Sequence, residues 1–181
     1  MLYNTLGKTG LKVSRLGFGT MRLPTTNSNA DINKQEASEM LTYGIENGIN
    51  IIDTAYPYHS AELDGNGNSE KFLGEYLTEN SLRDEIILQT KSPSWLMEKR
   101  SDFDYYLDIQ LEKLQTDYID IYLLHSLTVP DWNKVRDLGA LDFLDDGLSS
   151  GKIKHVGFSS HIEVDYFIEI LDEYPKWEVA L

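Results

Sequence analysis

Residues 85–91, EIILQTK, and residues 118–125, YIDIYLLH, decide the fold class of this chain. Both stretches are nearly continuous apolar runs, so polar and apolar residues do not alternate as they do in a half-exposed strand. Strands with two apolar faces are typical of a parallel sheet whose faces are covered by helices. We therefore predict that each run is the strand of a βα unit.

Runs of this kind recur along the chain at intervals of roughly 25 to 36 residues. The further predicted strands are residues 15–21, 49–53, 153–159 and the chain from residue 178 onward. Between the strands, apolar residues recur every three or four positions, as at 37–45 and 164–171, which predicts helices. Strand and helix are thus expected to alternate throughout.

Capping residues and a turn motif agree with these boundaries. Asn33 and Ser160 are predicted to cap the starts of two helices, because each precedes a glutamate by three positions. Gly48 and Gly151 lie where helices are expected to end. Residues 3–14, YNTLGKTGLKVS, have a Gly-Lys-Thr-Gly centre between apolar flanks and predict an N-terminal β-hairpin.

Chain length bears on the architecture. An eight-fold barrel with a repeat of about 34 residues needs roughly 270 residues, whereas this chain has 181. We therefore expect residues 1–181 to be a single α/β domain, an incomplete (β/α)8 TIM-type barrel of five to six parallel strands. An open doubly wound sheet would also fit the length. The glycine-rich loop of dinucleotide-binding doubly wound folds is absent, since Gly17-Phe18-Gly19 is followed by Thr20-Met21-Arg22.

Composition excludes several classes of function. The net charge of −14 disfavours binding to nucleic acids and to anionic membrane surfaces. Because the chain has no cysteine, it has no disulfide and no thiolate metal site, and we expect no metal. No apolar run reaches the length of a membrane helix, and residues 1–10 lack the apolar core of a signal peptide. A cytoplasmic location fits this composition.

Titratable side chains follow successive predicted strands at the end where α/β proteins bind ligands. These are Asp53 with the nearby Tyr58, then Lys91, then His125. Taken singly, each has an ordinary explanation, such as a turn cap for Asp53 or a solvated strand end for Lys91. Together they are poorly explained by solvation, because each follows an apolar run.

The set suggests acid–base chemistry on a carbonyl compound. An ammonium at Lys91 would favour the phenolate of Tyr58 and so assist it as a general acid. Asp53 would keep Lys91 charged and oriented, and a neutral His125 could donate a hydrogen bond to a substrate oxygen. None of these side chains supplies a hydride, which would require a nicotinamide cofactor.

The sequence resembles the aldo-keto reductases, a family of NAD(P)H-dependent (β/α) barrel enzymes. The resemblance lies in SRLGFGTMRLP at 14–24, GINIIDTAYPY at 48–58, NSEKFLG at 68–74, LQTK at 88–91, LQTDYIDIYLLH at 114–125 and GKIKHVGFSS at 151–160. These stretches occur in the family's order and span residues 3 to 180.

The resemblance implies roles for individual residues. It makes Asp53, Tyr58, Lys91 and His125 the catalytic tetrad. The residues implied to contact NADPH, or alternatively NADH, are Gly19, Thr20, Met21, Asp53, Ser159 and Ser160. Trp95 falls where the family often has an aromatic wall of the substrate pocket, although surface packing is an equally good explanation for this indole.

The sequence also departs from the family pattern. Ser159-Ser160 replaces the usual Ser-Asn, and a hydroxyl makes fewer hydrogen bonds to a carboxamide than an amide does. The loop from Tyr58 to Ser69 is about six residues longer than usual, and His59 replaces a common glycine. The segments that bind the adenosine phosphate in the family would lie beyond Leu181, and their lack could leave the isolated 181-residue chain inactive, so the sequence leaves its activity open.

An open barrel should expose two sheet edges. Three explanations fit such a chain: it is part of a longer reductase, two copies cover each other's edges, or the fold is unstable in solution. We favour the first, with self-association through the open edges of a stable chain.

The leading functional hypothesis is an NADPH-dependent oxidoreductase that reduces an aldehyde or ketone to an alcohol, with Tyr58 as proton donor. A non-catalytic binding or regulatory module of the same fold is the alternative. A lyase that uses Lys91 as a Schiff-base amine is a third possibility, which Asp53 disfavours because it keeps the amine protonated.

Overall fold

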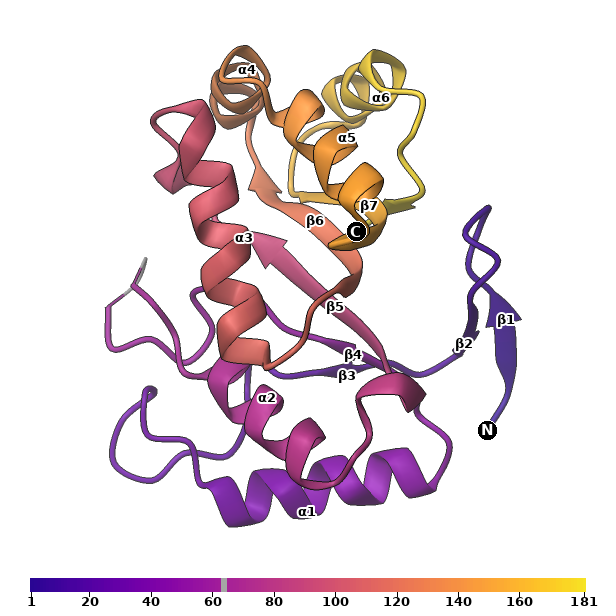
Figure 1. Cartoon of the computed structure of the whole chain (residues 1–181), viewed down its shortest axis with the longest axis vertical. Coiled ribbons are helices and arrows are strands. Elements are labelled where there is room, and N and C mark those ends of the chain that lie inside the picture. Colours follow the sequence, from indigo (N-terminus) through magenta and orange to yellow (C-terminus); the bar gives the residue numbers. More distant parts are fainter. Residues whose placement is uncertain (63–64) are drawn as a thin grey trace.

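A six-stranded parallel sheet forms the centre of the computed structural model, which describes residues 1–62 and 65–181 (Figure 1). Its strands are β3 (Phe18–Gly19), β4 (Ile51–Asp53), β5 (Ile87–Ser92), β6 (Ile119–Leu127), β7 (Ile153–Ser160) and β8 (Val179–Ala180). They pair in chain order, β3-β4-β5-β6-β7-β8. A doubly wound sheet would reverse direction part-way through this order. The incomplete barrel is therefore confirmed, and the doubly wound alternative is wrong.

Helices follow the strands and lie around the outer side of the curved sheet (Figure 1). They are α1 (Lys34–Glu46), α2 (Ser69–Glu79), α3 (Arg100–Leu114), α4 (Val129–Asp137), α5 (Ala140–Ser150) and α6 (Val164–Glu173), with 3-10 turns at Arg83–Glu85 and Ser94–Leu96. The core between sheet and helices includes Leu41, Leu88, Phe103 and Phe143. Because side chains alternate along a strand, the opposite face of the sheet is left to line the inside of the barrel.

Strand β5 shows how this alternation positions functional groups. Thr90 points to the helical side, where its hydroxyl donates to the buried carboxylate of Glu70 in α2. Gln89 and Lys91 point to the other side, where both bond to Asp53 of the neighbouring strand. Polar groups on the inner face are thus brought together at one end of the sheet.

The predicted hairpin is confirmed as β1 (Tyr3–Thr5) and β2 (Lys12–Ser14), which pair antiparallel. Its base is fixed near β4, since the Ser14 N–H donates to Asn50 Oδ1 over 2.7 Å. Its turn lies near the start of the edge strand β8, where a β-carbon placed on Gly7 would be 3.5 Å from the Glu178 carbonyl oxygen. The hairpin therefore runs across the end of the barrel opposite the predicted site.

The predicted helix ends are partly confirmed. Asn33 caps α1 by accepting from the Glu36 N–H, and Gly151 ends α5 in the left-handed conformation. The cap predicted at Ser160 is wrong, because Ser160 is the last residue of β7 and its hydroxyl donates to the Leu127 carbonyl of β6. Among the described residues, none of the helices is both long and apolar enough to cross a membrane.

Candidate active site

Lys91 lies at the centre of the candidate site, with only 1% of its surface exposed. Its Nζ lies 2.6 Å and 2.7 Å from the two carboxylate oxygens of Asp53, 2.9 Å from the Thr54 carbonyl oxygen and 3.0 Å from Tyr58 Oη. The carboxylate and the carbonyl compensate the ammonium for the water it loses on burial. The structure thus joins three of the four predicted catalytic residues through one ammonium group.

Asp53 is fixed from several directions. The Gln89 amide donates to Asp53 Oδ1 over 2.6 Å, and the backbone N–H and hydroxyl of Thr20 both donate to the Asp53 carbonyl oxygen. The Ser69 hydroxyl, at the start of α2, donates in turn to Thr20 Oγ1 over 2.7 Å. The carboxylate is therefore held in place before any ligand binds.

Tyr58 lies in the loop that connects β4 to α2. Its carbonyl accepts from the Ser69 N–H, and a β-carbon on Gly67 would lie only 2.0 Å from the same oxygen, so the loop can close this tightly only with glycine there. Residues 63 and 64 of the predicted long loop lie outside the described residues. The backbone on both sides of them holds Tyr58 over Lys91.

His125, the fourth predicted catalytic residue, completes the group. Its ring centroid lies 6.0 Å from that of Tyr58 at an interplanar angle of 80°, and 5.3 Å from that of Trp95. Burial lowers the pKa of His125 to about 3, and the positive charges of Lys91 and His161 act in the same direction. The imidazole is therefore neutral at physiological pH, and one ring nitrogen carries a hydrogen to donate.

Two buried nitrogen atoms beside the tyrosine lack a partner within residues 1–62 and 65–181. These are Nδ1 of His125, whose ring faces Tyr58, and Nε1 of Trp95, whose indole packs on His125. Buried polar atoms in native proteins are normally hydrogen-bonded, so such atoms at a strand end suit a site that receives a polar ligand.

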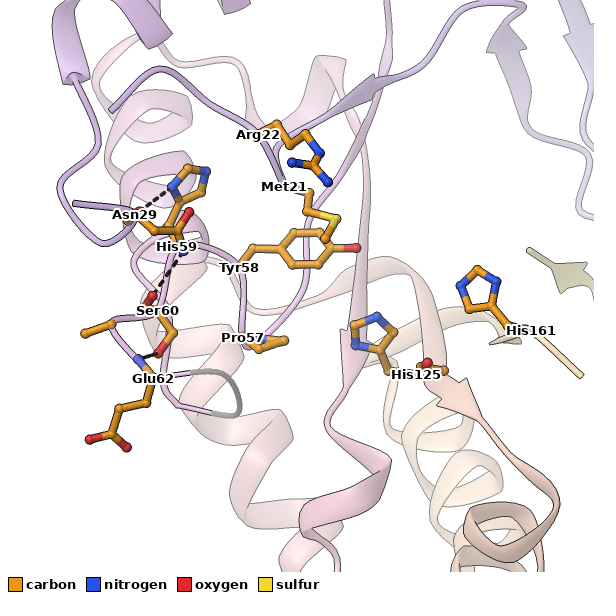
Figure 2. Close-up of a pocket in the computed structure, with 12 residues that line it drawn as sticks. Met21, Arg22, Asn29, Pro57, Tyr58, His59, Ser60, Glu62, His125 and His161 are labelled. Carbon is orange, nitrogen blue, oxygen red and sulfur yellow. Dashed lines mark hydrogen bonds between the residues drawn. The ribbon is translucent and has the colours of Figure 1, made fainter. Parts of the chain in front are cut away.

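A pocket of about 590 Å³ opens on Tyr58 and His125 (Figure 2). Figure 2 shows Met21 above the tyrosine ring, with the phenol oxygen directed to the side lined by His125 and His161. Lys91 contacts the Tyr58 hydroxyl, but neither Lys91 nor Asp53 lines the pocket. Trp95 does not line it either, although its indole packs on His125.

Apart from Asp53 at the end of β4, the residues predicted to contact a cofactor lie at the ends of β3 and β7. Gly19 borders open space, because a β-carbon there would meet nothing within 4 Å, and Met21 is exposed. The Ser159 hydroxyl accepts from the Ser126 N–H and keeps its hydrogen for another acceptor. The Ser160 hydroxyl donates to Leu127 and accepts from the Ile162 N–H, so it is fully engaged within the protein. The open surface at Gly19 on β3 and the free hydroxyl hydrogen of Ser159 on β7 are each suited to contact a polar ligand.

Sequence reasoning missed the role of His59. This side chain is 2% exposed; its Nδ1 lies 2.7 Å from the Asn29 carbonyl oxygen, and its Nε2 accepts from the Leu23 N–H over 3.1 Å. It thereby ties the tyrosine loop to the loop that carries Met21. Its φ of 60° explains why a glycine would suit this position.

A family model, described as the Aldo/keto reductase family, matches residues 15–179. The chain belongs to the aldo/keto reductase family. The resemblance inferred from the sequence motifs is confirmed, and with it an oxidoreductase family that acts on carbonyl compounds and generally uses nicotinamide cofactors.

Individual members of the aldo/keto reductase family support this assignment. "Protein tas" of Escherichia coli strain K12 is 31% identical to this chain over 88% of the chain and 52% of its own length. A "NADH-specific methylglyoxal reductase" of the same organism is 29% identical over 96% of the chain and 56% of its own length. A holo-form aldo-keto reductase from Bacillus halodurans superposes with a TM-score of 0.76 at 28% identity, over 99% of this chain and 55% of that one. The chain thus spans about half the length of the curated relatives it matches.

Proposed function

We propose that the site reduces an aldehyde or ketone to an alcohol, with Tyr58 as proton donor and NADPH, or alternatively NADH, as reductant. The observation that carries the proposal is the 3.0 Å contact between Lys91 Nζ and Tyr58 Oη, beside a neutral His125. The bound nicotinamide supplies the hydride that no side chain can provide.

Each residue of the tetrad has a separate task in this proposal. The Lys91 ammonium stabilises the negative charge that Tyr58 gains when it gives its proton to the carbonyl oxygen. Asp53 holds the ammonium charged and directed at the phenol oxygen. His125 donates a hydrogen bond to the carbonyl oxygen and so polarises it. The contacts around Lys91 and the neutral state of His125 support these proposed roles.

The cofactor's nicotinamide end is proposed to lie against Gly19 and Met21 and to receive a hydrogen bond from Ser159. Thr20 is fully buried and donates to Asp53, so we assign it to holding the carboxylate in place. The engaged hydroxyl of Ser160 makes it a weaker candidate for direct contact.

Titration of the 181-residue chain with NADPH and separately with NADH tests the proposal. Tryptophan fluorescence reports binding, and absorbance at 340 nm reports oxidation with an aldehyde added. Binding together with turnover is the expected result for a competent site. Binding without oxidation of either cofactor, across a panel of aldehydes and ketones, would instead support the non-catalytic module.

The lyase alternative is disfavoured by the contacts of Lys91. A Schiff-base amine must be neutral to attack a carbonyl, and the bidentate carboxylate of Asp53 stabilises the ammonium instead. Borohydride trapping of a carbonyl compound on Lys91 would favour the lyase.

We also propose that the reaction takes place in the cytoplasm, because a chain without cysteine needs no oxidising compartment.

We further propose that copies of the chain associate through the edges of the sheet. Within the described residues, β3 pairs only with β4 and β8 only with β7. Exposed apolar side chains flank both edges, including Met40 and Tyr43 of α1 and Val164 and Ile168 of α6. Light scattering that shows a monomer at high concentration would overturn the association.

A further inference from the structure

Two basic side chains face the proposed reaction centre without belonging to the tetrad. Arg22 follows β3 and His161 follows β7, and both line the pocket that contains Tyr58 and His125. Figure 2 shows Arg22 on one side and His161 on the other side of the space toward which the Tyr58 hydroxyl points. A molecule whose carbonyl meets Tyr58 would have its substituents between these two groups.

Arg22 differs from most arginines of this acidic chain. Arg83, Arg100 and Arg136 each form ion pairs with carboxylates. Among residues 1–62 and 65–181, by contrast, Arg22 has neither a side-chain hydrogen bond nor an ion pair, although the chain carries 30 acidic residues. Within this part of the chain its exposed guanidinium thus has no charge partner at the pocket.

Among the described residues that line the pocket, Glu62 carries the opposing charge. Figure 2 shows its carboxylate directed away from Tyr58, on the far side from Arg22. Among the described residues, the charged or titratable groups near the tyrosine hydroxyl include Arg22, His125 and His161 of the pocket lining and the ion pair of Lys91 with Asp53. Since Asp53 balances the charge of Lys91 and His125 is neutral, the positive charge that the described residues offer a ligand on this side of the pocket is that of Arg22.

We propose that Arg22, assisted by His161, forms an anion-binding subsite, so that the preferred substrates are small carbonyl compounds that carry a carboxylate or a phosphate. This inference rests on the proposed carbonyl reductase function. The planar guanidinium binds either group through two parallel hydrogen bonds, and a neutral or charged imidazole donates one more. The anion would hold the molecule while its carbonyl oxygen meets Tyr58 and His125.

The test compares a matched pair of ligands by binding, so that it does not depend on turnover. The anionic ligand is 4-formylbenzoate, and the neutral one is its methyl ester; 4-formylphenyl phosphate is the phosphate counterpart. Quenching of tryptophan fluorescence reports their binding at low salt, because the indole of Trp95 packs on His125, which lines the pocket. We expect the carboxylate to bind about tenfold more tightly than the ester, which corresponds to one charge-assisted contact.

Variants of two arginines locate the effect. Arg22→Ala should reduce the acid-to-ester preference to near unity, and Arg22→Lys should keep part of it because the charge remains without the planar fork. Arg15→Ala is the matched control, since Arg15 is also exposed but lies outside the pocket, and it should keep the full preference. His161→Ala should remove a smaller share than Arg22→Ala.

The outcomes separate this inference from the proposed function. Equal affinity for acid and ester in the wild-type chain, no measurable binding of the acid, or a preference that survives in Arg22→Ala would overturn the subsite. Reduction of the ester by the wild-type chain with NADPH tests the reductase independently of the anion. Tighter binding of 4-formylphenyl phosphate than of 4-formylbenzoate would assign the subsite to phosphate esters, and the reverse order would assign it to carboxylates.

Discussion

The side-chain amide of Gln89 donates to Asp53 Oδ1 over 2.6 Å, and the same oxygen lies 2.6 Å from Lys91 Nζ. Gln89 and Lys91 are two residues apart on β5, so both point to the same face of the sheet. The carboxylate is thus oriented by the same strand that supplies the ammonium it stabilises.

Replacement of this carboxylate should destabilise the whole fold. Asp53→Asn leaves a buried ammonium without a counter-charge, and we expect a loss of about 3 kcal/mol in the free energy of unfolding in urea. Glu75→Gln is the control, because its partner Lys34 is 66% exposed, and such a surface pair contributes less than about 1 kcal/mol. Equal effects of the two substitutions would contradict a stabilising role for the buried pair.

Loss of the tyrosine hydroxyl should affect chemistry far more than binding. Tyr58→Phe is expected to lower kcat by at least about a hundredfold, as the loss of a general acid does, while the Kd for NADPH stays within a factor of about two. Tyr43→Phe is the matched control, because Tyr43 is 72% exposed on α1. Turnover retained in the Tyr58 variant would show that another group delivers the proton.

The pKa of His125 predicts a pH dependence of stability. Since burial lowers this pKa to about 3 in the folded chain, the unfolded chain binds the proton first as the pH falls below about 6.5. The free energy of unfolding should therefore decrease between pH 6.5 and pH 4.5, by on the order of 2 kcal/mol more in the wild-type chain than in His125→Gln. Parallel curves for the two proteins would mean that His125 titrates normally.

Two substitutions of His59 can distinguish the effect of its hydrogen bonds on stability from the effect of its strained backbone conformation. His59→Ala should cost about 2 kcal/mol, because the Leu23 N–H and the Asn29 carbonyl lose their partner in a buried place. His59→Gly loses the same contacts but relieves the positive φ, so it should be about 1 kcal/mol more stable than the alanine variant. Urea unfolding measures both, and identical stabilities would argue against strain at this residue.

Two glycines at the barrel interior should respond differently to a methyl group. A β-carbon at Gly157 would lie 2.2 Å from the Val179 carbonyl oxygen, so Gly157→Ala should disturb the β7–β8 pairing and cost about 2 kcal/mol or more. Gly19→Ala meets open space and should change the free energy of unfolding by less than about 0.5 kcal/mol. It should nevertheless raise the Kd for NADPH if the nicotinamide ring lies against this glycine.

Strand order and the meeting of Asp53, Tyr58 and Lys91 were predictable from sequence, because buried parallel strands repeat at nearly constant spacing and align their ends. The strand predicted at residues 15–21 is much shorter in the structure, since in β3 only Phe18 and Gly19 pair with β4. Ser160 was misplaced because a serine before a glutamate satisfies a local rule, whereas its actual partner lies on a strand 33 residues away. The buried contacts of His59 and Gln89 depend on the tertiary fold, and no local pattern predicts them.

The β1–β2 hairpin contacts Asn50 at its base and approaches Glu178 at its turn, and this arrangement bears on the order in which the chain folds. Every strand pairing in the main sheet joins strands that are consecutive in the chain. The strands can therefore pair one after another in the order in which they are synthesised. The approach of Gly7 to Glu178 instead closes a loop that contains nearly the entire chain. Contacts that close long loops form slowly, so we expect the approach of Gly7 to Glu178 to form last, after the main sheet has assembled.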